Sequence, residues 1–291
     1  MTESGAANRK TAKKIESAIT DDSSAKMELD ITTYAKMKTW PEKFPDKKVS
    51  LRNKTPKSWD KIFDKLFKDE KFDDIERDLS KELENAAKIY PLPDLVFNAF
   101  NLTSFKKLKV VFIGQDPYFS SEEFKSKQVP QAMGLSFSVP HGIKVPSSLK
   151  NIYSNLKKYK HMEEVPDHGN LESWADQGCL MLNSSLTVKD GTDSKNCHQY
   201  LWRWFTNEII SYISEKKDQV IFVLWGRDAF AKSNLIDVKK HELIVSSHPS
   251  GLSANKPMGN YPAFNAIDHF GLINAQLKKW GIKEICWGND V

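Results

Sequence analysis

The sequence lacks the residue patterns that mark several common classes of protein. It has only three cysteines, Cys179, Cys197 and Cys286, an odd number without paired spacing. This excludes a disulfide framework or a zinc knuckle and favours a reducing compartment. The motifs GxxxxGK[ST], HExxH and GxGxxG are absent, so neither a cofactor nor a metal is predicted. No apolar run is long enough to span a bilayer, and we expect a soluble protein with no membrane contact.

Charge is a weak guide to the partner of this chain. The 43 lysines and arginines exceed the 38 acidic residues only slightly, for a net charge of +5. Lysines cluster near residues 106–109, 157–160 and 278–279. Such clusters are usually solvated faces, so charge alone favours nucleic-acid binding only modestly. A phosphate-binding face would have to be local.

Composition divides the chain into an extension and one domain. Residues before Leu29 contain no aromatic residue, leucine or valine, so we expect disorder at least to residue 28. The basic residues within 9–14 fit a nuclear address, a DNA-tethering arm or a solvated tail. Residues 29–56 could form an added strand or a docking arm. We assign residues 1–56 to an N-terminal extension and residues 57–291 to a single domain.

Apolar spacing within that domain predicts helices followed by alternating strands and helices. Helical spacing begins near Ser58, and further helices are expected at residues 147–158, 199–214 and roughly 264–280. Four nearly continuous apolar runs are typical of parallel strands buried on both faces, at residues 110–113, 179–182, 220–225 and 243–245. The pattern predicts an α/β fold with a central four-stranded parallel twisted sheet flanked by helices on both faces.

Polar residues follow three of these strands. Residues 114–118 (GQDPY) follow the first, and Pro117 biases Asp116 towards an extended backbone. Asn183 ends the second strand, and His248 follows the last. Because parallel strands end at the same edge of a sheet, these three side chains should lie together there. Asp116 alone would fit a helix cap equally well, but three convergent and chemically distinct groups predict a site.

Four motifs together resemble the uracil-DNA glycosylase family. GQDPY at 114–118 is similar to its water-activating loop and GLSFSV at 134–139 to its uracil-stacking segment. LMLN at 180–183 is similar to its uracil-reading strand, and HPSGLS at 248–253 to its DNA-intercalating loop. The resemblance covers about Ser58 to Trp287. It implies a DNA-repair hydrolase that flips uracil out of DNA and hydrolyses its N-glycosidic bond, leaving an abasic site.

The resemblance also implies the roles of the catalytic and uracil-binding residues. Asp116 would stabilise the oxocarbenium-like sugar and position water, and a neutral His248 would donate a hydrogen bond to uracil O2. Four residues would bind uracil: Gln115, Tyr118, Phe137 and Asn183. Among these, the Asn183 amide would pair with O4 and N3–H, Tyr118 would exclude a C5 methyl, and Phe137 would stack. Outside this context, Phe137 would be a core aromatic and Tyr118 a packing residue.

The remaining motif residues would hold DNA. Leu252 would enter the vacated base stack from the minor groove, although a lone exposed leucine is often incidental. Three residues would grip phosphates without recognising the base sequence, namely Pro146, Ser148 and Ser250.

The chain departs from the family pattern at several places. Phe119 stands where the family usually has a histidine, and Gly251 replaces a proline. Arg227 replaces a serine and either adds a phosphate contact or packs. Residues 120–131 and 255–262 are longer than usual. Asp116 and His248, the two residues that would stabilise charge, are both retained. We therefore expect these departures to change the rate and the DNA affinity and not the reaction itself.

Two other functions stay open at this stage. The chain could be a DNA-binding replication-accessory protein that retains the glycosylase fold, or a relative acting on mismatched or modified bases, against which Asn183 and Tyr118 argue. The expected partner is single- or double-stranded DNA containing uracil, together with a replication protein bound through the N-terminal extension. We expect a monomer in the nucleus or cytoplasm.

Overall fold

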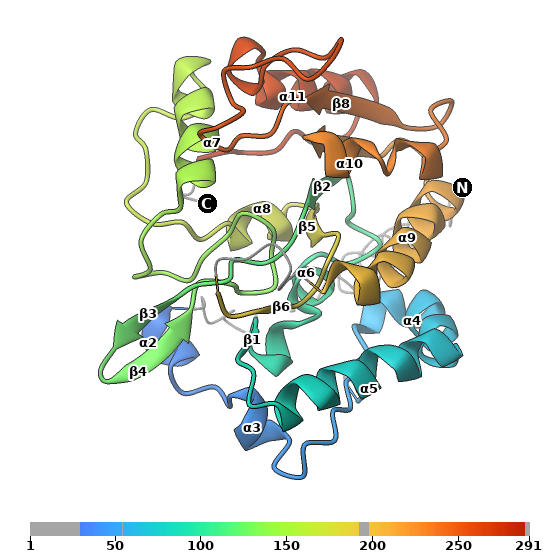
Figure 1. Cartoon of the computed structure of the whole chain (residues 1–291). Coiled ribbons are helices and arrows are strands. Elements are labelled where there is room, and N and C mark those ends of the chain that lie inside the picture. Colours follow the sequence, from blue (N-terminus) through green and yellow to red (C-terminus); the bar gives the residue numbers. More distant parts are fainter. Residues whose placement is uncertain (1–29, 54, 192–197, 289–291) are drawn as a thin grey trace, which may run out of the picture.

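A four-stranded parallel sheet lies at the centre of the protein (Figure 1). The computed structural model describes residues 30–53, 55–191 and 198–288, and the disorder predicted to residue 28 lies outside that part. The order along the sheet is β5-β2-β7-β8. The strands are β2 (Val110–Gly114), β5 (Cys179–Asn183), β7 (Ile221–Trp225) and β8 (Glu242–Ser246). The predicted fold class is confirmed.

The two faces of the sheet belong to two separate apolar clusters. In β2, Val111 and Ile113 join one cluster, while Val110 and Phe112 join the other, because successive side chains of a strand point to opposite faces. The first face is covered by α4 (Asp60–Phe67), α5 (Glu70–Glu84) and α9 (Gln199–Lys216). The second face is covered by α7 (Ser147–Lys158), α8 (Glu172–Asp176) and α11 (His269–Lys279).

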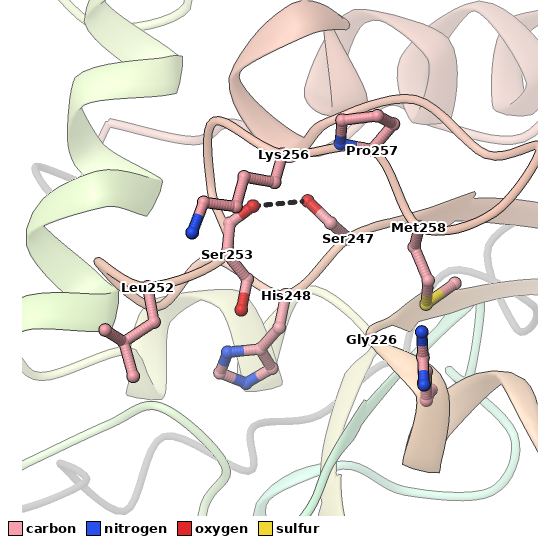
Figure 2. Close-up of a pocket in the computed structure, with 9 residues that line it drawn as sticks. Gly226, Ser247, His248, Leu252, Ser253, Lys256, Pro257 and Met258 are labelled. Carbon is pink, nitrogen blue, oxygen red and sulfur yellow. Dashed lines mark hydrogen bonds between the residues drawn. The ribbon is translucent and has the colours of Figure 1, made fainter.

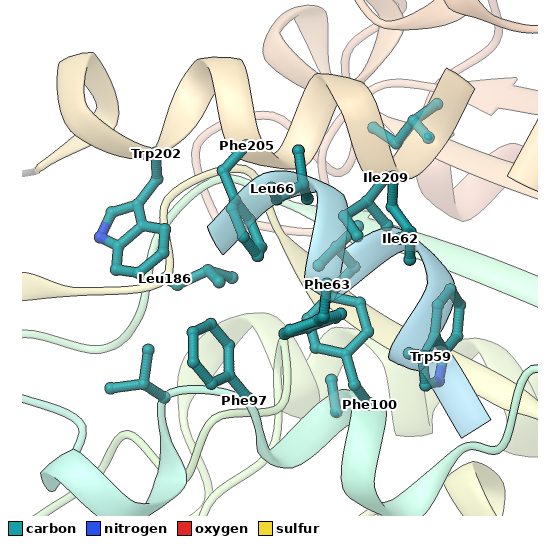
Figure 3. Packing of buried hydrophobic residues seen from close by; sticks show 14 of the residues in the cluster. Trp59, Ile62, Phe63, Leu66, Phe97, Phe100, Leu186, Trp202, Phe205 and Ile209 are labelled. Atoms are coloured by element: carbon teal, nitrogen blue, oxygen red, sulfur yellow. The ribbon is translucent and has the colours of Figure 1, made fainter. Parts of the chain in front are cut away.

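Aromatic rings dominate the first cluster. Figure 3 shows Phe63 of α4 facing Phe205 of α9, and their ring centroids lie 5.5 Å apart in an edge-to-face arrangement. Phe97 and Phe100 meet Phe63 from below, each with centroids 5.1 Å from it. Closely packed aromatic rings therefore hold the helices of this first face against the sheet.

The predicted final helix is interrupted. Residues 264–280 form a short turn, η6 (Phe264–Ala266), and then α11. Ile267 between them has an extended backbone (φ −127°, ψ 154°), and the Asp268 carboxylate accepts a hydrogen bond from the Gly271 amide. This N-cap starts a new helix where apolar spacing alone indicated a continuous one. The helices predicted at 147–158 and 199–214 are confirmed as α7 and α9.

Residues 30–53 form an arm that packs on the domain. The sequence left open a strand or a docking arm, and the structure has two short helices, α2 (Ile31–Tyr34) and α3 (Trp40–Lys43). Trp40 is buried, and its indole N–H donates to the Pro91 carbonyl at 2.8 Å. The Tyr34 hydroxyl donates to the Ala132 carbonyl.

Smaller elements complete the fold. The longer stretch at 120–131 is an antiparallel hairpin of β3 (Ser121–Phe124) and β4 (Lys127–Pro130). Strands β1 (Ile89–Tyr90) and β6 (Val188–Lys189) form another antiparallel pair. The short helices are η2 (Lys57–Trp59), η3 (Pro93–Leu95), α6 (Asn98–Leu102), α10 (Arg227–Phe230) and η5 (Ser233–Leu235).

Candidate active site

The loop that carries Asp116 starts against Asn183. Strands β2 and β5 pair with Gly114 opposite Asn183, and a Cβ atom on Gly114 would lie 2.2 Å from the Asn183 Oδ1 atom. The carboxamide thus occupies space that any other residue at 114 would fill. The backbone amides of the two residues after Asn183 donate to the carbonyl oxygens of Gly114 and Gln115, each at 2.9 Å. These hydrogen bonds fix the backbone of the two residues that precede Asp116.

Phe137 is held next to the same strand. The amide of the preceding Ser136 donates to the Met181 carbonyl of β5 at 2.9 Å. Phe137 has φ +64°, a conformation uncommon for an aromatic residue, and its carbonyl accepts a 3.0 Å hydrogen bond from the Tyr118 hydroxyl. The Phe137 ring centroid lies 6.0 Å from that of His248. Two predicted uracil-binding residues and a predicted catalytic residue therefore adjoin one another.

His248 is prepared as a neutral hydrogen-bond donor. Its Nδ1 atom accepts a hydrogen bond from the Ser250 amide at 3.0 Å, which leaves the ring proton on Nε2. Burial lowers the pKa of His248, opposed in part by the charge of Asp228. The imidazole is therefore uncharged near neutral pH, with Nε2–H as its donor.

The loop that follows His248 is tied at its base and exposed at its tip. The Ser247 hydroxyl donates to the Ser253 carbonyl at 2.9 Å (Figure 2), and it accepts a hydrogen bond from the Phe264 amide, also at 2.9 Å. The Ser253 amide donates to the Ser250 carbonyl at 3.0 Å. Leu252 at the tip is 85% exposed, and Figure 2 shows its side chain apart from the other residues drawn. The loop therefore exposes the apolar side chain of Leu252, while hydrogen bonds hold the ends of the loop in place.

The N-terminal half of α7 is joined to this loop. Pro146 is the N-cap of α7, and Ser148 lies in the first turn. The Asn151 side-chain amide donates to the Pro249 carbonyl at 2.7 Å. This bond brings the segments of Ser148 and Ser250 together. Sequence patterns gave no signal for Asn151, because its partner is a backbone carbonyl distant in sequence.

Two cavities open beside His248. Their volumes are about 240 Å³ and 350 Å³. Four residues line both: Gly226, Arg227, His248 and Ser253. The larger cavity reaches Gln115 and the smaller reaches Leu252. Gly226 has φ +94°, and a Cβ there would lie 3.0 Å from the His248 Cβ, so glycine also leaves room for this histidine. Through His248, the cavities connect one predicted uracil-binding residue, Gln115, with the predicted DNA-intercalating residue, Leu252.

The absence of a metal site and of a membrane-spanning helix concerns only the described residues. Across the described ranges, no group of three or more His, Cys, Asp and Glu residues is arranged to hold a metal ion. No helix in that part of the chain is long and apolar enough to cross a membrane. Cys179 is buried and Cys286 is exposed, and both are free thiols.

Comparisons with known proteins agree on one family. Residues 100–278 match the model of the uracil DNA glycosylase superfamily. The chain is 41% identical over 271 residues to a probable uracil-DNA glycosylase of Acanthamoeba polyphaga mimivirus, covering 89% of this chain and 72% of the relative. It is 42% identical to the uracil-DNA glycosylase of Helicobacter hepaticus, covering 80% of this chain and 95% of that one.

A solved structure leads to the same family. The crystal structure of mimivirus uracil-DNA glycosylase superposes with a TM-score of 0.84 and 41% sequence identity, covering 90% of this chain and 97% of that chain. The chain therefore belongs to the uracil DNA glycosylase superfamily and is a DNA-repair hydrolase that excises uracil from DNA.

Proposed function

We propose that Asp116 and His248 stabilise opposite charges in one transition state. As the bond between uracil N1 and the sugar C1′ breaks, its electron pair goes to the base and the sugar becomes oxocarbenium-like. The Asp116 carboxylate stabilises the cation, orients the water that adds to C1′ and accepts the proton that this water loses. His248 Nε2–H donates to O2 of the departing uracil anion. The hydrogen bond from the Ser250 amide to His248 Nδ1 supports this proposal most directly, because it fixes the ring proton on Nε2.

A neutral histidine suits this task in a preorganised site. A donor aimed at developing charge is typically worth about 2.7–4 kcal/mol of transition-state stabilisation. Burial keeps the imidazole uncharged, so it donates without needing to be protonated first. We therefore expect the rate to be level at neutral pH and to fall once acid protonates His248, at a pH below the usual histidine value.

The uracil-binding residues would select the base by its hydrogen bonds and shape. The Asn183 carboxamide, positioned over Gly114, can donate to uracil O4 and accept from N3–H. Cytosine offers the reverse pattern, and a buried polar partner left unpaired is a strong penalty. Tyr118 would block a methyl at C5, Phe137 would stack on the ring, and Gln115 would contact the base from the loop after β2.

DNA contacts would come from the α7 terminus and the loop after His248. Pro146, Ser148 and Ser250 would hold phosphates, which positions the duplex without reading its sequence. Leu252 would fill the stack left by the extruded nucleotide. The hydrogen bond from Asn151 to Pro249 supports a shared surface, because it joins the two segments.

An assay on oligonucleotides containing uracil tests these roles. With EDTA present, the unmutated protein should release uracil from single- and double-stranded DNA and leave abasic sites. Asp116→Asn and His248→Gln should each slow single-turnover release about 100- to 1,000-fold, the cost of one lost charge-stabilising group. Undiminished rates in either variant would contradict its role. His248→Gln should also lose the histidine-dependent acid limb of the pH–rate profile.

The organisation of the chain completes the proposal. Residues 57–291 would form the glycosylase domain, and residues 1–56 an extension whose part at 30–53 packs on it. The enzyme would act as a monomer in a reducing nuclear or cytoplasmic compartment, in keeping with the free thiols of Cys179 and Cys286. A replication protein would bind through the extension. Light scattering and pull-downs with and without residues 1–28 test the monomer and the partner.

A further inference from the structure

Lysines gather at the edge of the sheet opposite the candidate active site. Residues 105–109 lead into β2, residues 215–220 lead into β7, and residues 281–288 follow α11. Hydrogen bonds join these segments. Lys109 Nζ donates to the Lys283 carbonyl at 3.0 Å, and Lys217 Nζ donates to the Lys106 carbonyl at 3.4 Å. Five lysines therefore lie close together, and we call them the lysine cluster: Lys106, Lys107, Lys109, Lys217 and Lys283.

The protein does not neutralise the lysine cluster. Within the described residues, none of its members has a carboxylate oxygen within 4.0 Å of its Nζ atom. Burial lowers the pKa of Lys109, and the neighbouring charge of Lys283 adds to this effect. Three members are exposed to solvent: Lys106, Lys107 and Lys283. The cluster therefore crowds like charges that a bound anion would stabilise.

The acidic residues of the same segments do not offset this charge. Glu215 pairs with Lys216 at 2.6 Å. Asp218 pairs with Lys240 at 3.0 Å. Glu284 is exposed and has no cation within ion-pair distance in the described part of the chain. One unpaired carboxylate therefore stands against the five lysines of the cluster.

Helix ends account for other lysines nearby but not for the cluster. Lys216 is the last residue of α9, and α11 ends with Lys278 and Lys279. A positive side chain in the last turn is stabilised by the partial negative charge of the helix C-terminus. The exposed members of the cluster belong to no helix. Their charge therefore requires another explanation.

The chemistry of the cluster fits a nucleic-acid backbone better than a protein. Its exposed members are lysines alone, which are flexible point charges, whereas protein interfaces usually centre on aromatic residues, Met and Arg. Phe105, the nearby aromatic residue, is partly buried, and Lys217 Nζ lies over its ring, 5.4 Å from the centroid. Positive charge without an apolar centre binds phosphates and recognises no base sequence. DNA is the polyanion on which this enzyme acts.

The strands place the cluster away from DNA bound at the active site. Lys109 directly precedes β2, whereas the loop of Asp116 follows it, and the five residues of β2 span about 16 Å. DNA is stiff over about 150 base pairs, so a duplex held at one edge of the sheet does not fold back to the other. An occupant of the cluster therefore belongs to a second DNA segment.

We propose that the lysine cluster binds the backbone of a second DNA segment, so that the enzyme passes directly from one duplex to another. The inference takes the proposed DNA contacts of Ser250 and Leu252 as the first site. With both sites filled, the enzyme bridges two segments, and release from the first leaves it held by the second. It then moves between DNA segments without dissociating into solvent.

Direct transfer makes dissociation depend on the concentration of other DNA. Without a second site, competitor DNA only prevents rebinding, and the dissociation rate is constant once trapping is complete. A non-specific site with a Kd of about 10⁻⁵ M fills about tenfold more between about 1 and 100 µM competitor. The competitor-dependent part of the dissociation rate should rise about tenfold with it.

The experiment follows dissociation at increasing concentrations of undamaged duplex. Stopped-flow fluorescence measures the loss of a labelled duplex that carries a tetrahydrofuran abasic analogue. The cluster variant, Lys106→Ala/Lys107→Ala/Lys283→Ala, removes the three exposed charges and leaves the hydrogen-bonded Lys109 and Lys217 in place. We expect the competitor-dependent part of the rate in the unmutated protein and its loss in the cluster variant.

A control variant of equal charge separates the cluster from a general loss of positive charge. Lys48→Ala/Lys61→Ala/Lys68→Ala removes three exposed lysines in and near the arm and α4, none of them with an ion pair to a described residue. This control should keep the competitor dependence, as should a variant with arginine at all three exposed cluster positions. Thermal unfolding and uracil release from a short single-stranded oligonucleotide should be unchanged in every variant.

Three results would overturn the proposal. The first is a dissociation rate of the unmutated protein that does not depend on competitor, and the second is a dependence that survives in the cluster variant. The third is acceleration by polyglutamate but not by duplex, which would assign the cluster to an acidic protein. The abasic complex forms without uracil release, so a failed excision assay would contradict the proposed catalytic roles separately.

Discussion

At Gly114, a hydrogen atom in place of a side chain leaves room for the Asn183 carboxamide. Gly114→Ala should displace that group, because the added Cβ would lie 2.2 Å from Oδ1. A displacement of about 1 Å in such a site can cost about 100-fold in rate. We expect a loss of that order in kcat/KM on uracil-containing DNA. Gly288→Ala, where a Cβ meets nothing within 4 Å, is the control, and equal rates in both variants would contradict the argument.

Tyr118 is placed so that a single truncation should widen specificity. Its hydroxyl donates to the Phe137 carbonyl at 3.0 Å, which fixes the ring beside the proposed base site. Tyr118→Ala should open space at C5 and permit thymine excision, because a steric wall is what rejects a methyl, by about 10- to 200-fold. Excision assays on matched uracil and thymine oligonucleotides measure this ratio.

The matching control for Tyr118 keeps the ring. Tyr118→Phe loses the hydrogen bond to Phe137 but should still exclude thymine. Thymine excision by Tyr118→Phe, or its absence in Tyr118→Ala, would show that the Tyr118 ring is not what excludes the C5 methyl of thymine.

Among the elements, the loop after His248 depends on the Ser247 hydroxyl, which joins the Ser253 carbonyl to the Phe264 amide. Ser247→Ala leaves both groups without this partner, at a cost of about 1–3 kcal/mol for a buried unsatisfied group. A loosened loop should insert Leu252 less effectively. We therefore expect excision from double-stranded DNA to fall by about tenfold or more while excision from single strands falls less, since 1.4 kcal/mol is tenfold.

The control for Ser247 is another serine whose hydroxyl bonds a backbone carbonyl. Ser154 on α7 donates to the Lys150 carbonyl at 2.8 Å and is exposed. Ser154→Ala should leave the ratio of double- to single-strand excision unchanged. If Ser247→Ala also left this ratio unchanged, the Ser247 hydrogen bonds would not contribute to the insertion of Leu252.

Elements with a continuous apolar signal were predictable. Each of the four sheet strands lies within a residue of its predicted bounds. Strands β2, β5 and β7 are buried throughout, which requires a nearly continuous apolar sequence, whereas β8 at the edge of the sheet is only partly buried and begins at the exposed Glu242. The β3–β4 hairpin was not predicted, because its sequence is polar and its turn uses Lys125 and Ser126 at positive φ rather than the usual Asn or Gly. The break at Ile267 depends on the Asp268 cap, which apolar spacing does not register.

The site was predictable in part for the same reason. Parallel strands end at one edge, so the convergence of Asn183 and the backbone leading to Asp116 followed from the common direction of the strands. The resemblance supplied the roles. Asn151 was missed, because an asparagine bonded to a distant backbone carbonyl carries no sequence pattern.

For the whole molecule, buried histidines should make stability depend on pH. Burial lowers the pKa of His198 and of His269 to about 4. The unfolded chain takes up their protons near pH 6.5, before the folded chain does, so the free energy of unfolding falls as pH drops from about 6.5 towards 4. Each histidine contributes on the order of 3 kcal/mol to that loss.

Urea unfolding at pH 7.5 and pH 5 measures this dependence. His269 offers the sharper variant, because its Nδ1 accepts from the Trp225 indole at 3.1 Å and its Nε2 donates to the Phe264 carbonyl at 2.9 Å. His269→Gln should lower stability at pH 7.5 but reduce the difference between the two pH values. A difference as large as in the unmutated protein would assign the acid sensitivity to other groups.

The hairpin and the N-terminal arm also touch each other. Lys127 of β4 donates to the Ala35 carbonyl beyond α2, at 3.1 Å, and Ile31 donates to the His141 carbonyl at 2.9 Å. Two stretches that look like independent additions along the sequence also contribute to one apolar cluster, through Tyr34 of the arm and Val129 of the hairpin. Deleting either would expose the other to water, so evolution should gain or discard them as a pair: relatives with a short connection after the GQDPY loop should also lack the counterpart of residues 30–35.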